Sequence, residues 1–402
     1  MEIDERAARL DSLLAAASAD AVWLAQPDSF AWVTGGGDNR VGRDSSVGDA
    51  AVGYFGDGEW QVVTNSIEAE RLAAEQLPAA LSMSVTADPW HEADLAASVA
   101  ARSPESALAD FDVPGLSQFD PTRLRLRLSD DDVRRYRALG HEVATVVERV
   151  CRNLQSADTE REAASGIRVG LTGRGIEAPV LLVGGDERAQ SYRHPTPTTA
   201  QLGSYAMVVV TARRGGLYAS LSRLVAFDPP EWLAERQAVA QRVEMAALAA
   251  TREVAADLSP ATPDADSNSS HSDRNRDGDR DSEVTRDDGA LSTADAGTAG
   301  EVFDAIRQAY ADEGYEGEWR EHHQGGATGY AGREWVATPD SRAPVVAPAA
   351  YAWNPTVGGA KSEDTVLVRD GNVELLTATG EWPTTVVSVD GFALERPDVL
   401  EV

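Results

Sequence analysis

Residues 207–227 read MVVVTARRGGLYASLSRLVAF, and the prediction of the fold starts from this stretch. Two apolar runs, Met207–Ala212 and Leu217–Phe227, flank the pair Gly215-Gly216. Glycine adopts the positive φ angles of tight turns without steric cost, and valine-rich runs favour strands. The stretch therefore predicts two antiparallel strands joined by a hairpin turn.

Long helices are predicted on both sides of this hairpin. Ser129 with Asp132, and Thr159 with Glu162, form capping-box patterns in front of apolar residues at helical spacing. Further helices are predicted at 232–252 and 300–313. The remaining strands of this half are predicted at 179–183, 318–330, 345–353, 363–369 and 372–377.

Helical and strand patterns alternate along the first 120 residues. Helices are predicted at 4–17, 66–75 and 91–101, and strands at 21–25, 50–55, 60–64, 81–85 and 107–111. Such alternation is typical of an α/β domain. We therefore expect a mixed α/β (α+β) chain with one domain at 1–122 and a second at 128–402, joined by a connector at 120–128.

A polar segment interrupts the second domain at about 259–298. Between Asp264 and Asp288 the only apolar side chains are Ala265 and Val284, too few to offset the entropy of ordering. We expect a disordered, acidic surface insertion. It contains the start of a calcium-loop pattern (Asp273, Asn275, Asp277, Gly278, Asp279, Asp281), but Val284 stands where that loop needs a glutamate.

Charge and composition exclude several classes of function. The chain has 402 residues and a net charge of −30, which argues against nucleic acid and anionic membranes as partners. Lys361 is the only lysine, so the basic residues are almost all arginine. This acidic, lysine-poor pattern predicts a halophilic habitat, and the base composition of the genome is the alternative explanation for the scarcity of lysine. Cys151 is the only cysteine, so intramolecular disulfides are impossible. Without an apolar span or signal core, we expect a cytoplasmic protein.

Several short motifs occur in an order that resembles one family. They are Phe30–Gly36, Thr159-Glu160, Val183–Asp186, Tyr192–Thr198, Gln201–Gly203, Gly216–Arg223, Gly325–Tyr330 and Glu363–Val368. Together they resemble the creatinase and aminopeptidase, or pita-bread, family, which contains methionine aminopeptidase, Xaa-Pro aminopeptidase, prolidase and creatinase. The resemblance covers nearly the whole chain outside the insertion. It implies a creatinase-like N-terminal α/β domain and a C-terminal pita-bread domain.

The resemblance also implies a pair of divalent cations, held by two aspartates, one histidine and two glutamates. Val209 and Ser220 stand at the aspartate positions, Gly326 at that of the histidine, and Asn354 at that of the first glutamate. Only Glu363 keeps its ligand type. Because hard dications need several anionic oxygens, we expect this site to be empty, with no cofactor; a divalent metal (Mn, Co or Zn) stays an open alternative.

Three histidines are candidates for chemistry. His194 matches a family histidine that contacts substrate, and in creatinase, which works without metal, the matching residue transfers protons. Histidine suits this role because its pKa lies near neutrality; the alternative is a histidine hydrogen-bonded in a loop. His322 and His323 either contribute to the pocket, as substrate or weak metal contacts, or lie on a strand with one side chain inward and one outward.

Four further residues are candidates for substrate binding: Arg333, Glu334, Asn354 and Arg223. Arg333 could hold a carboxylate bidentately, or it could pair with Glu334 or Glu363. Asn354 could bind a substrate amide or cap the turn at Pro355. Arg223 matches a family arginine, for which a structural ion pair is the other interpretation.

These residues lead to three hypotheses about function. The first is a hydrolase of C–N bonds in a small amide, amidine or Xaa-Pro-type peptide that works without the two-metal cluster. The second is a catalytically inactive pita-bread protein with a binding role. The third is an Xaa-Pro-type metalloaminopeptidase with altered ligands. The expected partner is a small-molecule or peptide substrate, and the resemblance leaves a homodimer open.

Overall fold

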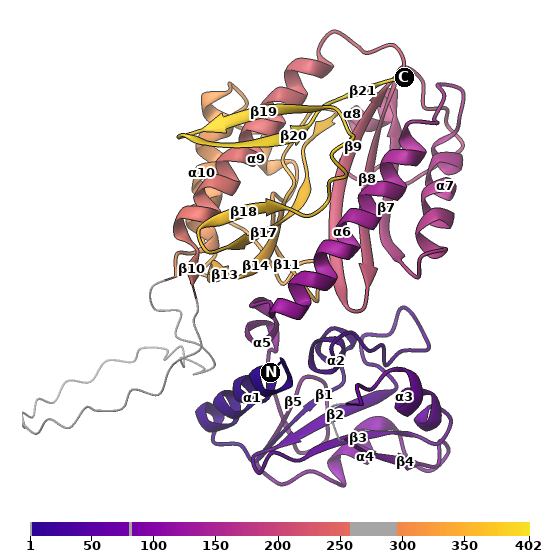
Figure 1. Cartoon of the computed structure of the whole chain (residues 1–402), viewed down its shortest axis with the longest axis vertical. Coiled ribbons are helices and arrows are strands. Elements are labelled where there is room, and N and C mark those ends of the chain that lie inside the picture. Colours follow the sequence, from indigo (N-terminus) through magenta and orange to yellow (C-terminus); the bar gives the residue numbers. More distant parts are fainter. Residues whose placement is uncertain (1, 80–82, 258–295) are drawn as a thin grey trace, which may run out of the picture.

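The computed structural model describes residues 2–79, 83–257 and 296–402, which form an N-terminal and a C-terminal part lying one above the other (Figure 1). The N-terminal part is built on a six-stranded sheet in the order β4-β3-β2-β1-β5-β6. Its elements are α1 (Glu2–Ala17), β1 (Ala21–Leu24), α2 (Pro27–Thr34), β2 (Ala50–Phe55), β3 (Trp60–Asn65), α3 (Ala69–Glu75), β4 (Ser84–Asp88), α4 (Leu95–Ala100), β5 (Ala107–Ala109) and β6 (Ser117–Gln118). The short helix α5 (Thr122–Leu126) leads to the C-terminal part.

The C-terminal part is built on a nine-stranded sheet that follows the path β12-β11-β14-β17-β9-β8-β7, with β18 added to β17 and β21 to β9. Its strands are β7 (Glu177–Gly185), β8 (Tyr205–Arg214), β9 (Leu217–Ala226), β11 (Gly325–Thr328), β12 (Trp335–Val336), β14 (Ala349–Trp353), β17 (Asp364–Arg369), β18 (Asn372–Leu375) and β21 (Leu400–Glu401). Smaller two-stranded pairings join β10 (Ala256–Asp257) to β13 (Val346–Ala347), β15 (Thr356–Val357) to β16 (Ala360–Lys361), and β19 (Thr384–Val389) to β20 (Phe392–Pro397).

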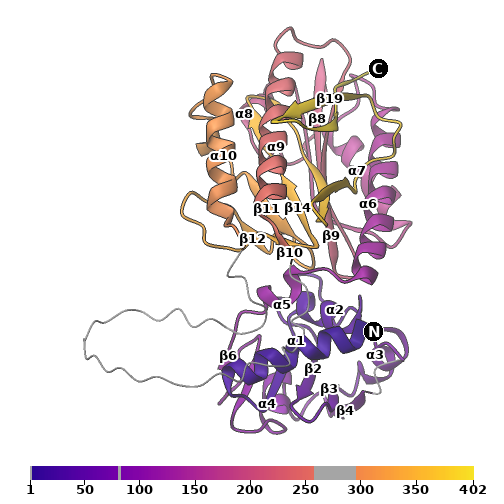
Figure 2. The ribbon, with the colours of Figure 1, turned by 60° about the vertical axis from the view of Figure 1, so that its left-hand side comes forward.

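Two pairs of helices cover this sheet (Figure 2). Helices α6 (Asp130–Cys151) and α7 (Glu160–Thr172) pack on the half formed by β7, β8 and β9, whereas α9 (Leu233–Val254) and α10 (Ala299–Asp312) pack together over the half that contains β14. Because side chains alternate along a strand, Val208 and Val210 of β8 point into the core shared with α6, and Val209 points to the other face. That other face carries the candidate site.

Buried ion pairs join the two parts of the molecule. Arg125 of α5 donates to Ser29 of α2 at 2.8 Å and to Glu334, in the loop after β11, at 3.0 Å. Arg6 of α1 pairs with Asp132 of α6 at 3.2 Å. These charges are nearly inaccessible to water, so each one depends on its partner to offset its lost hydration.

The fold agrees with the sequence-based predictions where the signal is local. The mixed α/β class and the central hairpin are confirmed, since β8 and β9 pair in register around the predicted turn. Both predicted capping boxes are present, at Ser129 with Asp132 and at Thr159 with Glu162.

Other predictions are wrong, and the differences have local causes. The strand expected at 318–330 is a 3₁₀ turn η1 (Glu318–Arg320) followed by a loop, with only β11 as strand. Pro348 divides the strand expected at 345–353, because proline has no N–H for the sheet ladder. The strand expected at 81–85 is β4, which begins at Ser84, and residues 81–82 lie outside the described part.

The acidic insertion, with its calcium-like pattern, also lies outside the described residues, apart from 296–298. Thr298 caps α10. Among the helices of the described ranges, none combines the length and apolar character that a bilayer crossing requires.

Candidate functional site

A cavity of about 190 Å³ lies on the face of the C-terminal sheet opposite α6 and α7. Apolar side chains of β7 and β8 form one wall, and polar side chains from loops and from β16 form the rest. Its lining residues are Val180, Leu182, His194, Val209, Thr211, His323, Gly332, Arg333, Asn354, Lys361 and Glu363. The structure thus brings together five of the residues proposed from sequence: His194, His323, Arg333, Asn354 and Glu363.

The carboxylate of Glu363 is the anionic centre of this cavity. It lies directly before β17, is 2% exposed, and accepts a hydrogen bond from Ser222 Oγ at 2.8 Å. Arg333 Nη2 lies 3.1 Å from one carboxylate oxygen and Lys361 Nζ lies 3.4 Å from the other. Burial raises the pKa of Glu363, but the charges of Lys361 and Arg333 outweigh burial and hold the pKa below its usual value.

Lys361 is a site residue that the sequence analysis missed. It lies on β16, is 2% exposed, and has Glu363 as its only ion-pair partner among the described residues. Burial lowers the pKa of Lys361, and the carboxylate of Glu363 opposes this shift. Two signals in the sequence could have found it: Lys361 is the only lysine, and its position two residues before Glu363 places both on one face of an extended segment.

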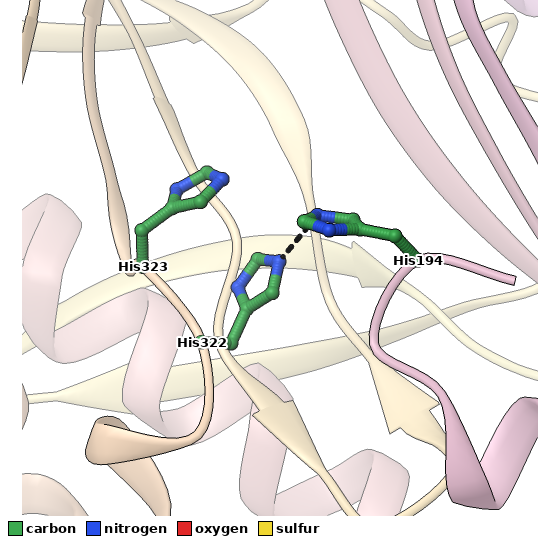
Figure 3. Close-up of side chains that lie close together, drawn as sticks. All are labelled: His194, His322 and His323. Carbon is green, nitrogen blue, oxygen red and sulfur yellow. Dashed lines mark hydrogen bonds between the residues drawn. The ribbon is translucent and has the colours of Figure 1, made fainter.

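Three imidazoles gather at one side of the cavity (Figure 3). His194 follows α8 (Asp186–Ser191), and the neighbours His322 and His323 follow η1. His322 Nε2 lies 3.0 Å from His194 Nε2, and the rings of His322 and His323 are stacked with centroids 4.4 Å apart. The predicted strand is wrong, because both residues lie in the loop after η1; the expected alternation is found, since His322 is buried and His323 is exposed. Both rings lie beside His194.

The environment keeps these imidazoles neutral. Burial, followed by the charge of Lys361, lowers the pKa of His194 and lowers that of His322 to about 2. Burial and the charge of Arg333 lower the pKa of His323 to about 4. At neutral pH each ring therefore has one nitrogen that can accept a hydrogen bond and one that can donate one.

Several buried polar atoms around the cavity have no hydrogen-bond partner among the described residues. They are the donor Nε of Arg333, the acceptor Oδ1 of Asn354 and Nδ1 of His322. An unpaired buried polar atom costs about 1–3 kcal/mol. A ligand that supplies both an acceptor and a donor would satisfy these atoms.

Arg223 and Glu334 do not line the cavity, although both were candidates for substrate binding. Arg223 is buried between Glu148, at 3.2 Å, and Asp364, at 3.0 Å. Glu334 pairs with Arg125 and accepts hydrogen bonds from the backbone N–H groups of the loop that carries it. Both side chains are occupied by ion pairs, which favours the structural interpretation.

Gly326 and Ser220 were proposed at positions where the resemblance implies metal ligands. A Cβ at Gly326 would lie 2.1 Å from the carbonyl oxygen of Trp335, so β12 leaves no room for a histidine there. Ser220 Oγ lies 2.9 Å from Thr211 Oγ1, which pairs two neutral hydroxyl groups across β8 and β9. Neither position supplies an anionic or imidazole ligand.

The donor set does not fit a pair of divalent cations. Glu363 is the only carboxylate on the cavity wall, and the cations Lys361 and Arg333 already neutralise it. A dication there would be repelled by two fixed positive charges. In the part of the chain that the structure describes, one group could hold a single metal ion: one ligand atom from each of His194, His322 and His323 lies within 4.8 Å of the others.

Comparisons with known proteins agree with this architecture. No protein-family model and no curated protein matches the sequence. Among solved structures, dipeptidase PepE from Mycobacterium ulcerans superposes with a TM-score of 0.69 at 17% identity, covering 100% of this chain and 98% of that one. A Xaa-Pro dipeptidase from Bacillus anthracis gives 0.67 at 13% identity, with 100% of both chains covered. The N-terminal domain of the FACT complex subunit SPT16 from chickpea gives 0.57 at 11% identity, covering 94% of this chain and 97% of that one.

The fold is thus that of the creatinase and aminopeptidase group: an α/β N-terminal domain followed by a pita-bread domain, as the resemblance predicted. Dipeptidases and a subunit of the FACT complex both have this fold, so the fold alone does not fix the activity.

Proposed function

We propose that the protein hydrolyses a C–N bond in a small amide, amidine or Xaa-Pro-type peptide, without the two-metal cluster that the resemblance implies. One observation carries the proposal: the cavity places a neutral imidazole, His194, beside a carboxylate that is neutralised by side-chain cations. In this arrangement the cavity has its own positive charges and its own proton acceptor.

His194 is the catalytic residue in this proposal. Its imidazole accepts a proton from the attacking water as the C–O bond forms, and it returns that proton to the leaving nitrogen as the C–N bond breaks. The 3.0 Å contact with His322 Nε2 orients the ring. Arg333 and Asn354 hold the substrate, and Glu363 fixes the position of Arg333.

Replacement of His194 tests this role. The assay follows release of amine from Xaa-Pro dipeptides, small amides and amidines by purified full-length protein. We expect His194→Ala to lower kcat by at least about 100-fold, the usual contribution of a general acid–base. The control is His141→Ala, which removes a histidine from the exposed face of α6, where its ring meets the Ala378 carbonyl. Unchanged turnover in His194→Ala would remove His194 from the mechanism.

A catalytically inactive binding protein is the second candidate. Two observations favour it: residues other than the implied ligands stand at Ser220, Gly326 and Asn354, and the same fold occurs in SPT16, a protein described as a subunit of a complex. Binding of a panel member with no turnover over long incubation would support this candidate, and hydrolysis of any member would refute it.

A further inference from the structure

We infer that the cavity recognises the carboxylate group of its ligand, and that Lys361 and Arg333 bind it. This inference deepens the proposed function, on which it rests for the view that the cavity is the substrate site. It narrows the substrate class to small molecules with a free carboxylate, such as dipeptides or acylated amino acids. Amidines and guanidines without a carboxylate, which are cations, would be excluded.

The first step of the argument is the charge of the cavity. Lys361 and Arg333 face the single carboxylate of Glu363, so the wall carries one uncompensated positive charge in a protein whose net charge is −30. Lys361 is fully buried. A buried charge without a full complement of partners is destabilising, and an anionic ligand group would reduce that penalty.

Neighbouring acids do not supply the missing negative charge. Glu244 is a further carboxylate that acts on Lys361, but it already meets Arg396 at 2.5 Å and accepts a hydrogen bond from Ser362. It belongs to a separate buried network whose three carboxylates are matched by three guanidinium groups. These are Glu148, Asp364 and Glu244 with Arg152, Arg223 and Arg396. The excess positive charge therefore belongs to the cavity.

The second step is the placement of free hydrogen-bonding atoms. Arg333 and Lys361 approach different oxygens of Glu363, and both side chains line the cavity. Arg333 Nε is a buried donor without a partner among the described residues, and Asn354 Oδ1 is a buried acceptor in the same situation. A ligand carboxylate would accept hydrogen bonds from the cationic donors, and a ligand N–H group would donate a hydrogen bond to Asn354 Oδ1. Peptides and acylated amino acids carry both groups close together.

The size of the cavity agrees with such a ligand. Its volume of about 190 Å³ equals the space of about six water molecules, which suits an amino-acid derivative but not a long peptide. Val180, Leu182 and Val209 supply an apolar wall for a side chain or a proline ring.

Matched acid and amide pairs test the inference. Isothermal titration of the full-length protein at constant ionic strength would compare glycyl-proline with glycyl-prolinamide, N-acetylglycine with its amide, and acetate with acetamide, all up to high millimolar concentration. Each pair has nearly the same shape and differs in one negative charge. We expect at least one acid to bind at least about tenfold more tightly than its amide.

Two variants locate the effect. Lys361→Met removes the ammonium group, keeps a similar side-chain volume and leaves Glu363 paired with Arg333, and Arg333→Gln changes a more accessible side chain in case Lys361 is needed for folding. We expect each to weaken binding of the acid about tenfold or more, and thereby to reduce or abolish the preference for the acid over its amide. The control Arg214→Gln also removes one positive charge, but from a pair with Glu142 outside the cavity, and it should keep the preference.

The outcomes separate this inference from the proposed hydrolysis. If no acid binds, if acids and amides bind equally, or if both cavity variants keep the preference for acids, the inference is overturned. Binding of acids without hydrolysis would support the inference and contradict the proposed activity. Hydrolysis of amides and acids alike, with no preference for the acid, would support the activity and overturn the inference.

Discussion

The variant Glu363→Gln removes the one negative charge of the cavity and keeps the shape of the side chain. The carboxylate is 2% exposed and has three partners, at 2.8 Å, 3.1 Å and 3.4 Å, of which two are cations. The amide oxygen of the introduced glutamine can still accept the hydrogen bond from Ser222, but Lys361 and Arg333 are left without an opposite charge. Removing one member of a buried ion pair costs about 3–5 kcal/mol, and we expect this loss in the free energy of unfolding.

Denaturant unfolding at neutral pH and fixed salt measures this loss. The control is Glu142→Gln, because Glu142 pairs with Arg214 on the surface, at 36% exposure, and such pairs contribute about 0–1 kcal/mol. The double variant Glu363→Gln/Lys361→Met should recover much of the loss, since it removes both a cation and the carboxylate. A loss below about 1 kcal/mol in Glu363→Gln would refute the view that this carboxylate holds the two cations.

The same ion pairs set a pH dependence. The pKa of Glu363 is lower in the folded state than its ordinary value of 4.5, so its stabilising contribution is complete above that value and is lost as pH falls through the lower, folded pKa. The wild-type protein should therefore lose more stability than Glu363→Gln when the pH is lowered through this acidic range.

Three further predictions follow from the charge and packing of the chain. Protein dialysed after exposure to Mn²⁺, Co²⁺ or Zn²⁺ should retain less than two equivalents in metal analysis, because the cavity wall has one carboxylate and two cations; two retained equivalents would contradict the charge argument and favour an altered metalloaminopeptidase. Gly326→Ala should lower the melting temperature by several degrees, since its Cβ would lie 2.1 Å from the Trp335 carbonyl oxygen, whereas Gly371→Ala, with no atom near its Cβ, should suffer only from its positive φ. The net charge of −30 should make unfolding depend on salt, and equal stability in dilute and molar salt would contradict the expected halophilic habitat.

Local signals in the sequence were sufficient for much of the fold. A capping box needs only residues three apart, so Ser129 with Asp132 could be recognised without knowledge of the tertiary structure. The hairpin at Gly215-Gly216 is equally local. By contrast, the hairpin of β19 and β20 was missed, although Asp390 and Gly391 at its turn, both at positive φ, are a turn signal.

The candidate site depends on contacts that the sequence does not display. His194 and His322 are 128 residues apart in the chain, and their contact arises only when the loop after η1 reaches the loop after α8. Helical or strand periodicity cannot predict a contact between two distant loops. The periodicity around the two neighbouring histidines therefore led only to a local prediction, that of a strand. The same limit applies to Lys361, since its burial is set by β15 and β16 folding over the cavity.

The only lysine of the chain lies in the cavity, and this makes a direct spectroscopic measurement possible. Protein grown with lysine labelled at its side-chain nitrogen and adjacent carbon would give a single side-chain resonance, without assignment by mutagenesis and without background from the surface. The chemical shift of that resonance would report whether the amine carries its proton, and titration with a candidate ligand would show, from one peak, whether the molecule has entered.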